Sequence, residues 1–235
     1  MWDYGRVTVL LSGGGGRKAV RQIIDRLCRE LVEREGTATP RLGLAAGSDQ
    51  VTAEAVAVVA GKHGIEVVEL PATPQTGDVL TLAALVVGDG DAAQQLMAFG
   101  ETVTDLRGLV HRGASYVGIG SGAAIAAEQA LLGGSELGGV PVAPTIAETE
   151  QEVELTAGLG LIDLTVLPHA AASGRIGLGI AAIEAGFTDR IVGLDDETTL
   201  AISDGALNLL GPGSMWELVQ ADDGVLVRTS RAAES

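Results

Sequence analysis

The stretch YVGIGSGAAIAAEQAL, residues 116–131, places one serine between an apolar run and a run with helical composition. The apolar run predicts a strand over residues 115–118, and the alanine-rich run predicts a helix over residues 123–132. A serine at such a turn is either a nucleophile whose hydroxyl projects above the sheet or only a small residue that the sharp turn requires. The sequence leaves both interpretations of Ser121 open.

Small residues surround Ser121 as a strained nucleophile turn would require, because bulk would clash where the chain reverses. The N–H of Gly122, the next residue, can point at a developing oxyanion. The strict G-x-S-x-G pattern is not met, however, since the positions two before and two after the serine are Ile119 and Ala123. The motif alone therefore does not decide between the two interpretations.

Short runs rich in Val, Ile and Leu alternate with alanine-rich helical stretches along the first part of the chain. This pattern is typical of parallel strands covered by helices on both faces. We expect a single α/β domain over residues 1–235, with a doubly wound, mostly parallel and flavodoxin-like sheet. The predicted strands are residues 7–11, 41–45, 66–70, 83–87 and 115–118, and the predicted helices are residues 17–35, 52–63, 92–99, 101–112 and 123–132.

The pattern changes in the second part of the chain. Residues 133–156 contain Pro141, Pro144 and a run of glutamates, which favours a long excursion or flap. The alternation over residues 152–155 fits an exposed edge strand equally well. Beyond residue 158 we expect shorter strands that pair antiparallel at one edge, at residues 165–167, 191–194, 199–203, 206–209 and 216–219.

The charge balance excludes several classes of partner. The chain carries 15 Lys and Arg against 31 Asp and Glu, a net charge of -16, so nucleic acid and anionic membranes would be repelled. The opening MWDYGRVTVLLSGGGG lacks the features of a signal peptide, and no charge-free apolar run is long enough to span a bilayer. We expect a soluble cytoplasmic protein that binds neither nucleic acid nor membrane.

The single cysteine, Cys28, lies in the apolar stripe of the first predicted helix. One cysteine excludes an internal disulfide, and its position fits a small buried hydrophobic residue. A catalytic thiol is not expected there.

The densest glycine cluster is SGGGGRK, residues 12–18, between the first predicted strand and helix. Such a turn can present backbone N–H groups to an anion. It matches neither the P-loop nor the full dinucleotide fingerprint, so nucleotide binding is not favoured.

A nucleophilic serine needs a base, and the chain has only three histidines. His63 and His111 lie at predicted helix ends, where a surface histidine is common. His169 directly follows a short apolar strand, and α/β sheets gather their sites at the carboxyl ends of strands. His169 is therefore the candidate base, although a structural role is also open.

The base must in turn be oriented by a carboxylate. Asp195, Asp196 and Glu197 follow the strand predicted at residues 191–194. The order serine, histidine, acid differs from the order in α/β-hydrolases, but geometry and not order defines a triad.

Together these segments resemble the cyanophycinase and dipeptidase E family of serine peptidases over most of the chain. The similar segments are the glycine-rich residues 12–16, the turn GDGD at residues 88–91, the serine turn IGSGAAI at residues 119–125, GLGLIDLTVLPH at residues 158–169, GLDDETTLAI at residues 193–202 and LNLLGPGSMWEL at residues 207–218. The resemblance implies a fold similar to class I glutamine amidotransferases and hydrolysis of peptides or isopeptides at aspartyl residues.

The resemblance also implies roles for individual residues. Ser121 would be the nucleophile, His169 the general base, and Asp196 the acid, with Glu197 as the adjacent alternative. The oxyanion hole would use the N–H of Gly122 and one N–H from the turn formed by Gly88, Asp89 and Gly90. A homodimer is a further expectation that only the family carries.

Several substrate-binding positions depart from the family pattern. The glutamine of the family's G-G-x-Q turn is Asp91, the D-Q before the histidine is Leu167-Pro168, and the cyanophycinase arginines survive only as Arg175. Because losing buried polar partners costs discrimination, cyanophycin itself is not the expected substrate. Asp91 and Arg175 remain the candidate substrate-binding residues.

Two functions follow from this pattern. The first is a serine peptidase or amidohydrolase acting on a small peptide or amide through Ser121, His169 and Asp196 or Glu197. The second is a catalytically inactive relative that serves as a binding or regulatory subunit. Neither requires a cofactor, and the histidines lack metal-ligand spacing, so we expect no metal site.

Overall fold

The computed structural model describes residues 7–35, 38–144, 152–203 and 206–232. A seven-stranded sheet with the order β13-β12-β1-β5-β4-β2-β3 forms its centre. The five neighbouring strands from β1 to β3 are parallel to one another. At the other end of the order, β12 pairs antiparallel with β1, and β13 pairs antiparallel with β12. The parallel strands are β1 (Val7–Ser12), β2 (Arg41–Leu44), β3 (Glu66–Glu69), β4 (Ala84–Val87) and β5 (Ser115–Ile119), and the antiparallel ones are β12 (Thr199–Ser203) and β13 (Ala206–Leu210).

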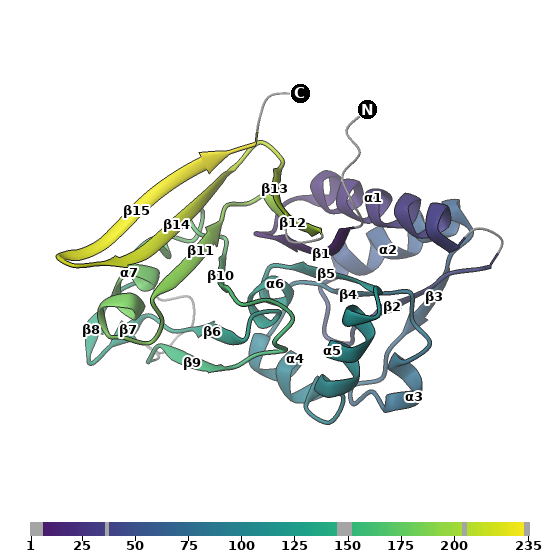
Figure 1. Cartoon of the computed structure of the whole chain (residues 1–235), viewed down its shortest axis with the longest axis horizontal. Coiled ribbons are helices and arrows are strands. Elements are labelled where there is room, and N and C mark those ends of the chain that lie inside the picture. Colours follow the sequence, from purple (N-terminus) through teal and green to yellow (C-terminus); the bar gives the residue numbers. More distant parts are fainter. Residues whose placement is uncertain (1–6, 36–37, 145–151, 204–205, 233–235) are drawn as a thin grey trace.

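Helices cover both faces of this sheet (Figure 1). Alternate strand residues point to opposite faces, which divides the buried side chains into two groups. On one face Leu10 and Leu42 pack with Ile24 and Val56 of α1 (Arg17–Glu35) and α2 (Gln50–His63). On the other face the apolar core includes Phe99 and Leu106, from the group α3 (Thr76–Val79), α4 (Ala92–Phe99) and α5 (Val103–His111).

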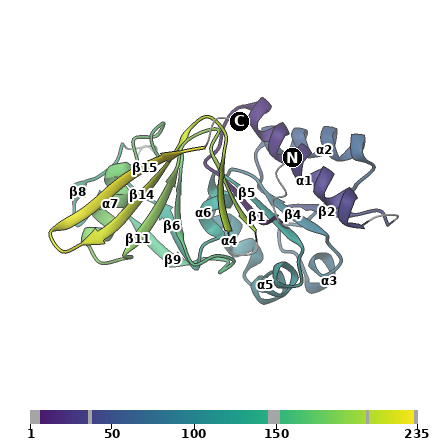
Figure 2. The same ribbon diagram turned by 45° about the horizontal axis from the view of Figure 1, so that its top comes forward.

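A second, four-stranded sheet lies beside the first, with the order β10-β11-β14-β15 (Figure 2). Its strands are β10 (Thr165–Pro168), β11 (Arg190–Leu194), β14 (Ser214–Ala221) and β15 (Gly224–Arg231), and α7 (Ile176–Glu184) packs against it. The expected α/β class, with a largely parallel central sheet and antiparallel strands near the C-terminus, is confirmed. The expected antiparallel pairing is wrong for β10 and β11, which run parallel.

The helix predicted over residues 123–132 is wrong in its second half. The helix α6 covers only Ser121–Ile125, and residues Gln129–Gly133 form the strand β6. That strand pairs antiparallel with β9 (Glu154–Ala157), and its Ala130 and Leu131 are buried. Tertiary pairing here outweighs the helix propensity of alanine and leucine.

The strand β9 overlaps the edge strand that the alternation at residues 152–155 suggested. A short hairpin of β7 (Glu136–Leu137) and β8 (Val140–Pro141) precedes it. Residues 145–151 of the predicted excursion lie outside the described residues. Within the part of the chain that the structure describes, no helix is both long and apolar enough to cross a bilayer.

Candidate active site

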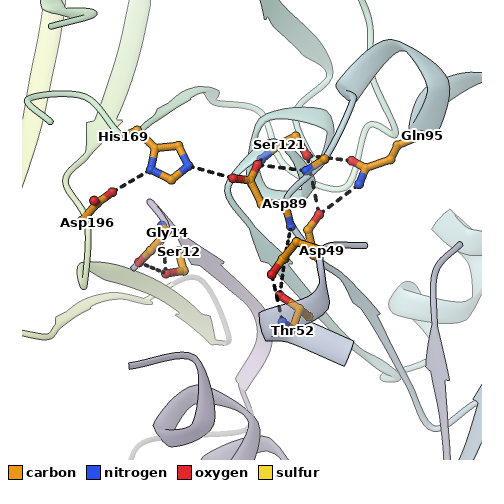
Figure 3. Close-up of polar contacts among 11 residues, drawn as sticks. Ser12, Gly14, Asp49, Thr52, Asp89, Gln95, Ser121, His169 and Asp196 are labelled. Carbon is orange, nitrogen blue, oxygen red and sulfur yellow. Dashed lines mark hydrogen bonds and ion pairs between the residues drawn. The ribbon is translucent and has the colours of Figure 1, made fainter. Parts of the chain in front are cut away.

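Four of the residues that the sequence singled out meet where the two sheets adjoin. Ser121 follows β5 and Asp89 follows β4, while His169 follows β10 and Asp196 follows β11. Each therefore stands at the carboxyl end of a strand, the usual position of sites in such folds. Ser121, Asp89 and His169 line a cavity of about 590 Å³, and Figure 3 shows the four side chains in one row.

The turn that carries Ser121 is as tight as the sequence suggested. Gly120 has φ 56° and ψ −121°, a backbone conformation that side chains rarely adopt. A Cβ at Gly122 would lie 2.1 Å from the carbonyl oxygen of Val87, so this position has no room for a side chain. The buried hydroxyl of Tyr116 donates to the carbonyl oxygen of Gly122 at 2.6 Å and so fixes the turn from below.

The hydroxyl of Ser121 points toward α4 and not toward the histidine. Its Oγ donates to Oε1 of Gln95 at 2.9 Å. Gln95 is buried, and its Nε2 donates to the carbonyl oxygen of Gly88 at 3.0 Å. This residue was not among those predicted from the sequence. The available signal was its position four residues before Phe99, which places an amide on the buried face of the helix.

His169 is seated on the glycine-rich opening of the chain. Its backbone has φ 52°, and its N–H donates to the carbonyl oxygen of Gly13 at 2.9 Å. A Cβ at Gly14 would lie 2.1 Å from Cε1 of the imidazole, so only glycine leaves room for the ring. Residues 12–16 thus support the histidine, a role that the nucleotide-binding motifs did not suggest.

Of the three candidate acids, Asp196 contacts the histidine. Its Oδ1 lies 2.6 Å from Nδ1 of His169. The side chain of Glu197 instead lies beside Gly15 and lines a separate cavity of about 720 Å³ over α1. The carboxylate of Asp195 accepts from Nε1 of Trp216 at 2.9 Å and serves the second sheet.

The other ring nitrogen of His169 contacts Asp89, which the sequence analysis considered only for its backbone. Oδ2 of Asp89 lies 3.1 Å from Nε2 of His169, and Oδ1 accepts from the N–H of Ser121 at 2.8 Å and of Gly90 at 3.0 Å. The carboxylate therefore lies between serine and histidine (Figure 3). Among the described contacts, Ser121 and His169 share no hydrogen bond.

The three N–H groups of the turn at residues 88–90, one of which was expected to contribute to the oxyanion hole, already have partners. The N–H of Gly88 donates to Oγ of Ser48 at 2.9 Å, and that of Asp89 donates to Oδ2 of Asp49 at 3.0 Å. The N–H of Gly90 donates to the side chain of Asp89 itself. Of the three, only the N–H of Gly90 would be freed by a change of the Asp89 rotamer.

The two carboxylates around His169 determine its protonation. The hydrogen bond with Asp89 raises the pKa of His169, burial lowers it, and the bond with Asp196 raises it again, with a net rise. Burial raises the pKa of Asp89, but hydrogen bonds from His169, Ser121 and Gly90 together bring it below its ordinary value. Because ionised carboxylates only accept hydrogen bonds, both ring nitrogens must carry protons. The raised pKa of His169 favours the imidazolium, the form that can donate to both carboxylates.

The two candidate substrate-binding residues line the same cavity. Asp91 caps α4, where it accepts from the N–H of Gln94 at 3.0 Å. Arg175 has a buried Nε with no hydrogen-bond partner among the described residues, and burial lowers its pKa while the charge of Asp89 raises it. Over the part of the chain that the structure describes, no group of three or more His, Cys, Asp or Glu side chains could hold a metal ion.

Comparisons with known proteins identify the family. A crystal structure of a protein assigned as a peptidase E from Listeria monocytogenes EGD-e superposes with a TM-score of 0.58 at 16% identity, over 89% of this chain and 100% of that one. This likeness shows a shared fold. No protein with a curated description matches the sequence significantly. The profile of peptidase family S51 matches residues 9–210. The chain therefore belongs to peptidase family S51, the family of serine peptidases that includes cyanophycinase and dipeptidase E.

Proposed function

We propose that this protein is a serine hydrolase that cleaves a peptide, isopeptide or other amide bond through Ser121, His169 and Asp196. The observation that carries the proposal is the 2.6 Å contact between Nδ1 of His169 and Oδ1 of Asp196. It orients the imidazole so that its other nitrogen faces the cavity that Ser121 also lines. Acyl transfer requires a histidine oriented by a carboxylate and a serine at a tight turn beside the same cavity, and both are present once the Asp89 carboxylate moves from between them.

The proposed reaction has two steps. Oγ of Ser121 attacks the carbonyl carbon while Nε2 of His169 takes its proton and then gives it to the leaving amine. Water next attacks the acyl-enzyme, again with His169 as base, and releases the acid product and the free serine. Asp196 stabilises the imidazolium in both steps. The N–H of Gly122 is the expected first donor to the oxyanion, and that of Gly90 the second.

The cavity supports a small, charged substrate. Arg175 offers a partly desolvated guanidinium, which suits a substrate carboxylate, since arginine binds carboxylates in a bidentate manner. Asp91, Glu152 and Glu154 line the same cavity and would favour a cationic or amine-bearing group. Of the arginines that the cyanophycinases use, only Arg175 has a counterpart in this chain, so we do not propose cyanophycin as the substrate.

One observation favours the second candidate, a relative that binds ligands without cleaving them. The Asp89 carboxylate separates Ser121 from His169, and the serine hydroxyl is bonded to Gln95. In a protein without catalytic activity, the Asp89 carboxylate could stay between Ser121 and His169 at all times. A hydrolase must be able to leave it.

A fluorophosphonate probe separates the two candidates. We expect it to label the wild type and Ser230→Ala, which changes an exposed serine of β15, but not Ser121→Ala. His169→Gln should also lose labelling, because the serine would lack a base. Labelling should be followed for hours and repeated with Asp89→Ala. If neither the wild type nor Asp89→Ala is labelled while both remain folded, the binding function is favoured.

A further inference from the structure

The Asp89 carboxylate occupies the path along which the Ser121 proton would travel. We infer that Asp89 is a gate, whose carboxylate holds the resting site closed and must rotate away before Ser121 and His169 can meet. The inference rests on the proposed function, because a gate has meaning only for a site that opens. No feature of the turn GDGD at residues 88–91 predicts this role for the side chain of Asp89.

The contacts of Asp89 show which part of it can move. Its N–H donates to Oδ2 of Asp49 at 3.0 Å, and its carbonyl oxygen accepts from the N–H of Asp49 at 2.8 Å. Asp49 is itself held by Thr52, at 3.0 Å to the backbone N–H and 2.6 Å to the hydroxyl. The backbone of Asp89 is thus fixed on both sides. Opening is therefore a rotation of its side chain.

Three hydrogen bonds keep the gate closed in this structure. Two come from the N–H groups of Ser121 and Gly90, and the third comes from the imidazolium of His169. The side chain also lies against Gly120, where a Cβ would come within 2.3 Å of Cγ of Asp89. The positive φ and the missing side chain at Gly120 leave the space that the carboxylate fills.

Deprotonation of His169 would weaken the closed state. A neutral ring that still donates from Nδ1 to Asp196 has a lone pair on Nε2, which would face the negative Oδ2 of Asp89. The attraction then becomes a repulsion, so loss of that proton favours rotation. The same proton must be absent before the ring can act as a base, and the two requirements are met together.

Rotation would also prepare the rest of the site. It releases the N–H of Gly90, which can then donate to a substrate oxygen. The departing carboxylate remains in a cavity with Arg175, whose guanidinium already interacts with the charge of Asp89. One side-chain movement would thus expose the base, complete a donor pair and keep the moved charge paired.

An NMR double-mutant cycle tests the gate without any need for activity. The imidazole resonances of His169 are recorded in the wild type, Ser121→Ala, Asp89→Ala and the double variant. We expect Ser121→Ala to leave these resonances nearly unmoved in the wild type but to shift them in the Asp89→Ala background, where serine and histidine can meet. No shift in that background, or equal shifts in both, would overturn the inference.

Labelling by the fluorophosphonate probe gives the second readout. Removing a charge-assisted hydrogen bond and the steric block should speed labelling of Ser121 about tenfold or more. Asp223→Ala, which removes an equal charge from an exposed turn, should label at the wild-type rate. If circular dichroism shows that Asp89→Ala does not fold, Asp89→Ser takes its place in both experiments. The serine keeps an oxygen that can accept from the N–H of Gly90.

The two proposals can fail separately. If the wild type is labelled and Asp89→Ala is labelled no faster, the gate is wrong and the hydrolase proposal stands. If neither is labelled, the hydrolase proposal is wrong, and the NMR cycle still decides whether Asp89 keeps serine and histidine apart.

Discussion

The imidazole of His169 lies directly over Gly14, with Cε1 only 2.1 Å from the position that a Cβ on Gly14 would take. Gly14 also has φ +119°, a conformation that strains any other residue. The glycine run therefore determines where the candidate base stands, although it is far from the base in sequence.

Gly14→Ala should displace His169 from Asp196. We expect a loss of about 1–3 kcal/mol in the free energy of unfolding, the usual cost of a strained backbone, together with a severe loss of fluorophosphonate labelling. Urea denaturation and labelling rates measure the two effects. Gly16→Ala is the matched control, because a Cβ there meets no atom within 4 Å and should leave both unchanged. Equal behaviour of the two variants would contradict this role of Gly14.

The main sheet could be predicted because its strands are short apolar runs bounded by helices with regular apolar spacing. The predicted helix at residues 17–35 matches α1, and residues 199–203 match β12. The strand β6 could not be predicted, since its Gln129–Gly133 sequence favours a helix and only its pairing with β9 makes it a strand.

The candidate site was predictable to the extent that its residues follow strands. Ser121 and His169 were singled out in this way, because strand ends are the usual positions of chemistry, whereas only the family resemblance chose Asp196 among the acids after the next strand. The catalytic roles of all three stay predictions. The side chain of Asp89 was not singled out, since it acts through a contact with a residue far away in sequence, and Gln95 was missed although its spacing from Phe99 marks the buried face of the helix. Asp89 reaches His169 across 80 positions, and no local pattern encodes that distance.

Cys28 should be unreactive in the native protein. Its thiol is fully buried in the core under α1, and burial raises its pKa to about 12, so almost no thiolate forms near neutral pH. Iodoacetamide should modify Cys28 only after unfolding in urea, as read by mass spectrometry. Rapid native modification, or loss of fluorophosphonate labelling on Cys28→Ala, would contradict a purely structural role.

Gln95→Leu should destabilise the turn that carries Ser121. The change removes the acceptor of the Ser121 hydroxyl and the donor to the Gly88 carbonyl. Leaving buried polar groups unpaired should cost about 1–3 kcal/mol of unfolding free energy. Gln94→Leu, at an exposed position of the same helix, should cost less than about 0.5 kcal/mol. Similar costs in urea denaturation would show that the buried amide contributes little.

The ion pair between His169 and Asp89 should stabilise the fold only within a limited range of pH. The pKa of His169 is raised, so its contribution is fully present below the ordinary value near 6.5 and is lost as the pH rises through the folded value. The pKa of Asp89 is lowered, so its contribution is present above the ordinary value near 3.9 and is lost as the pH falls through the folded value.

The largest stabilisation therefore falls between about pH 4 and pH 6.5. Asp196 also faces the ring, and Arg175, Glu152 and Glu154 line the same cavity. Because Asp89 is 42% exposed, solvent screening should limit the effect to about 1 kcal/mol or less. Urea denaturation at several pH values should show that His169→Gln loses most stability within this range, whereas His111→Gln, on an exposed helix end, follows the wild type. A difference between wild type and His169→Gln that does not change as the pH rises from about 5 to about 9 would show that packing of the ring, and not its charge, stabilises the site.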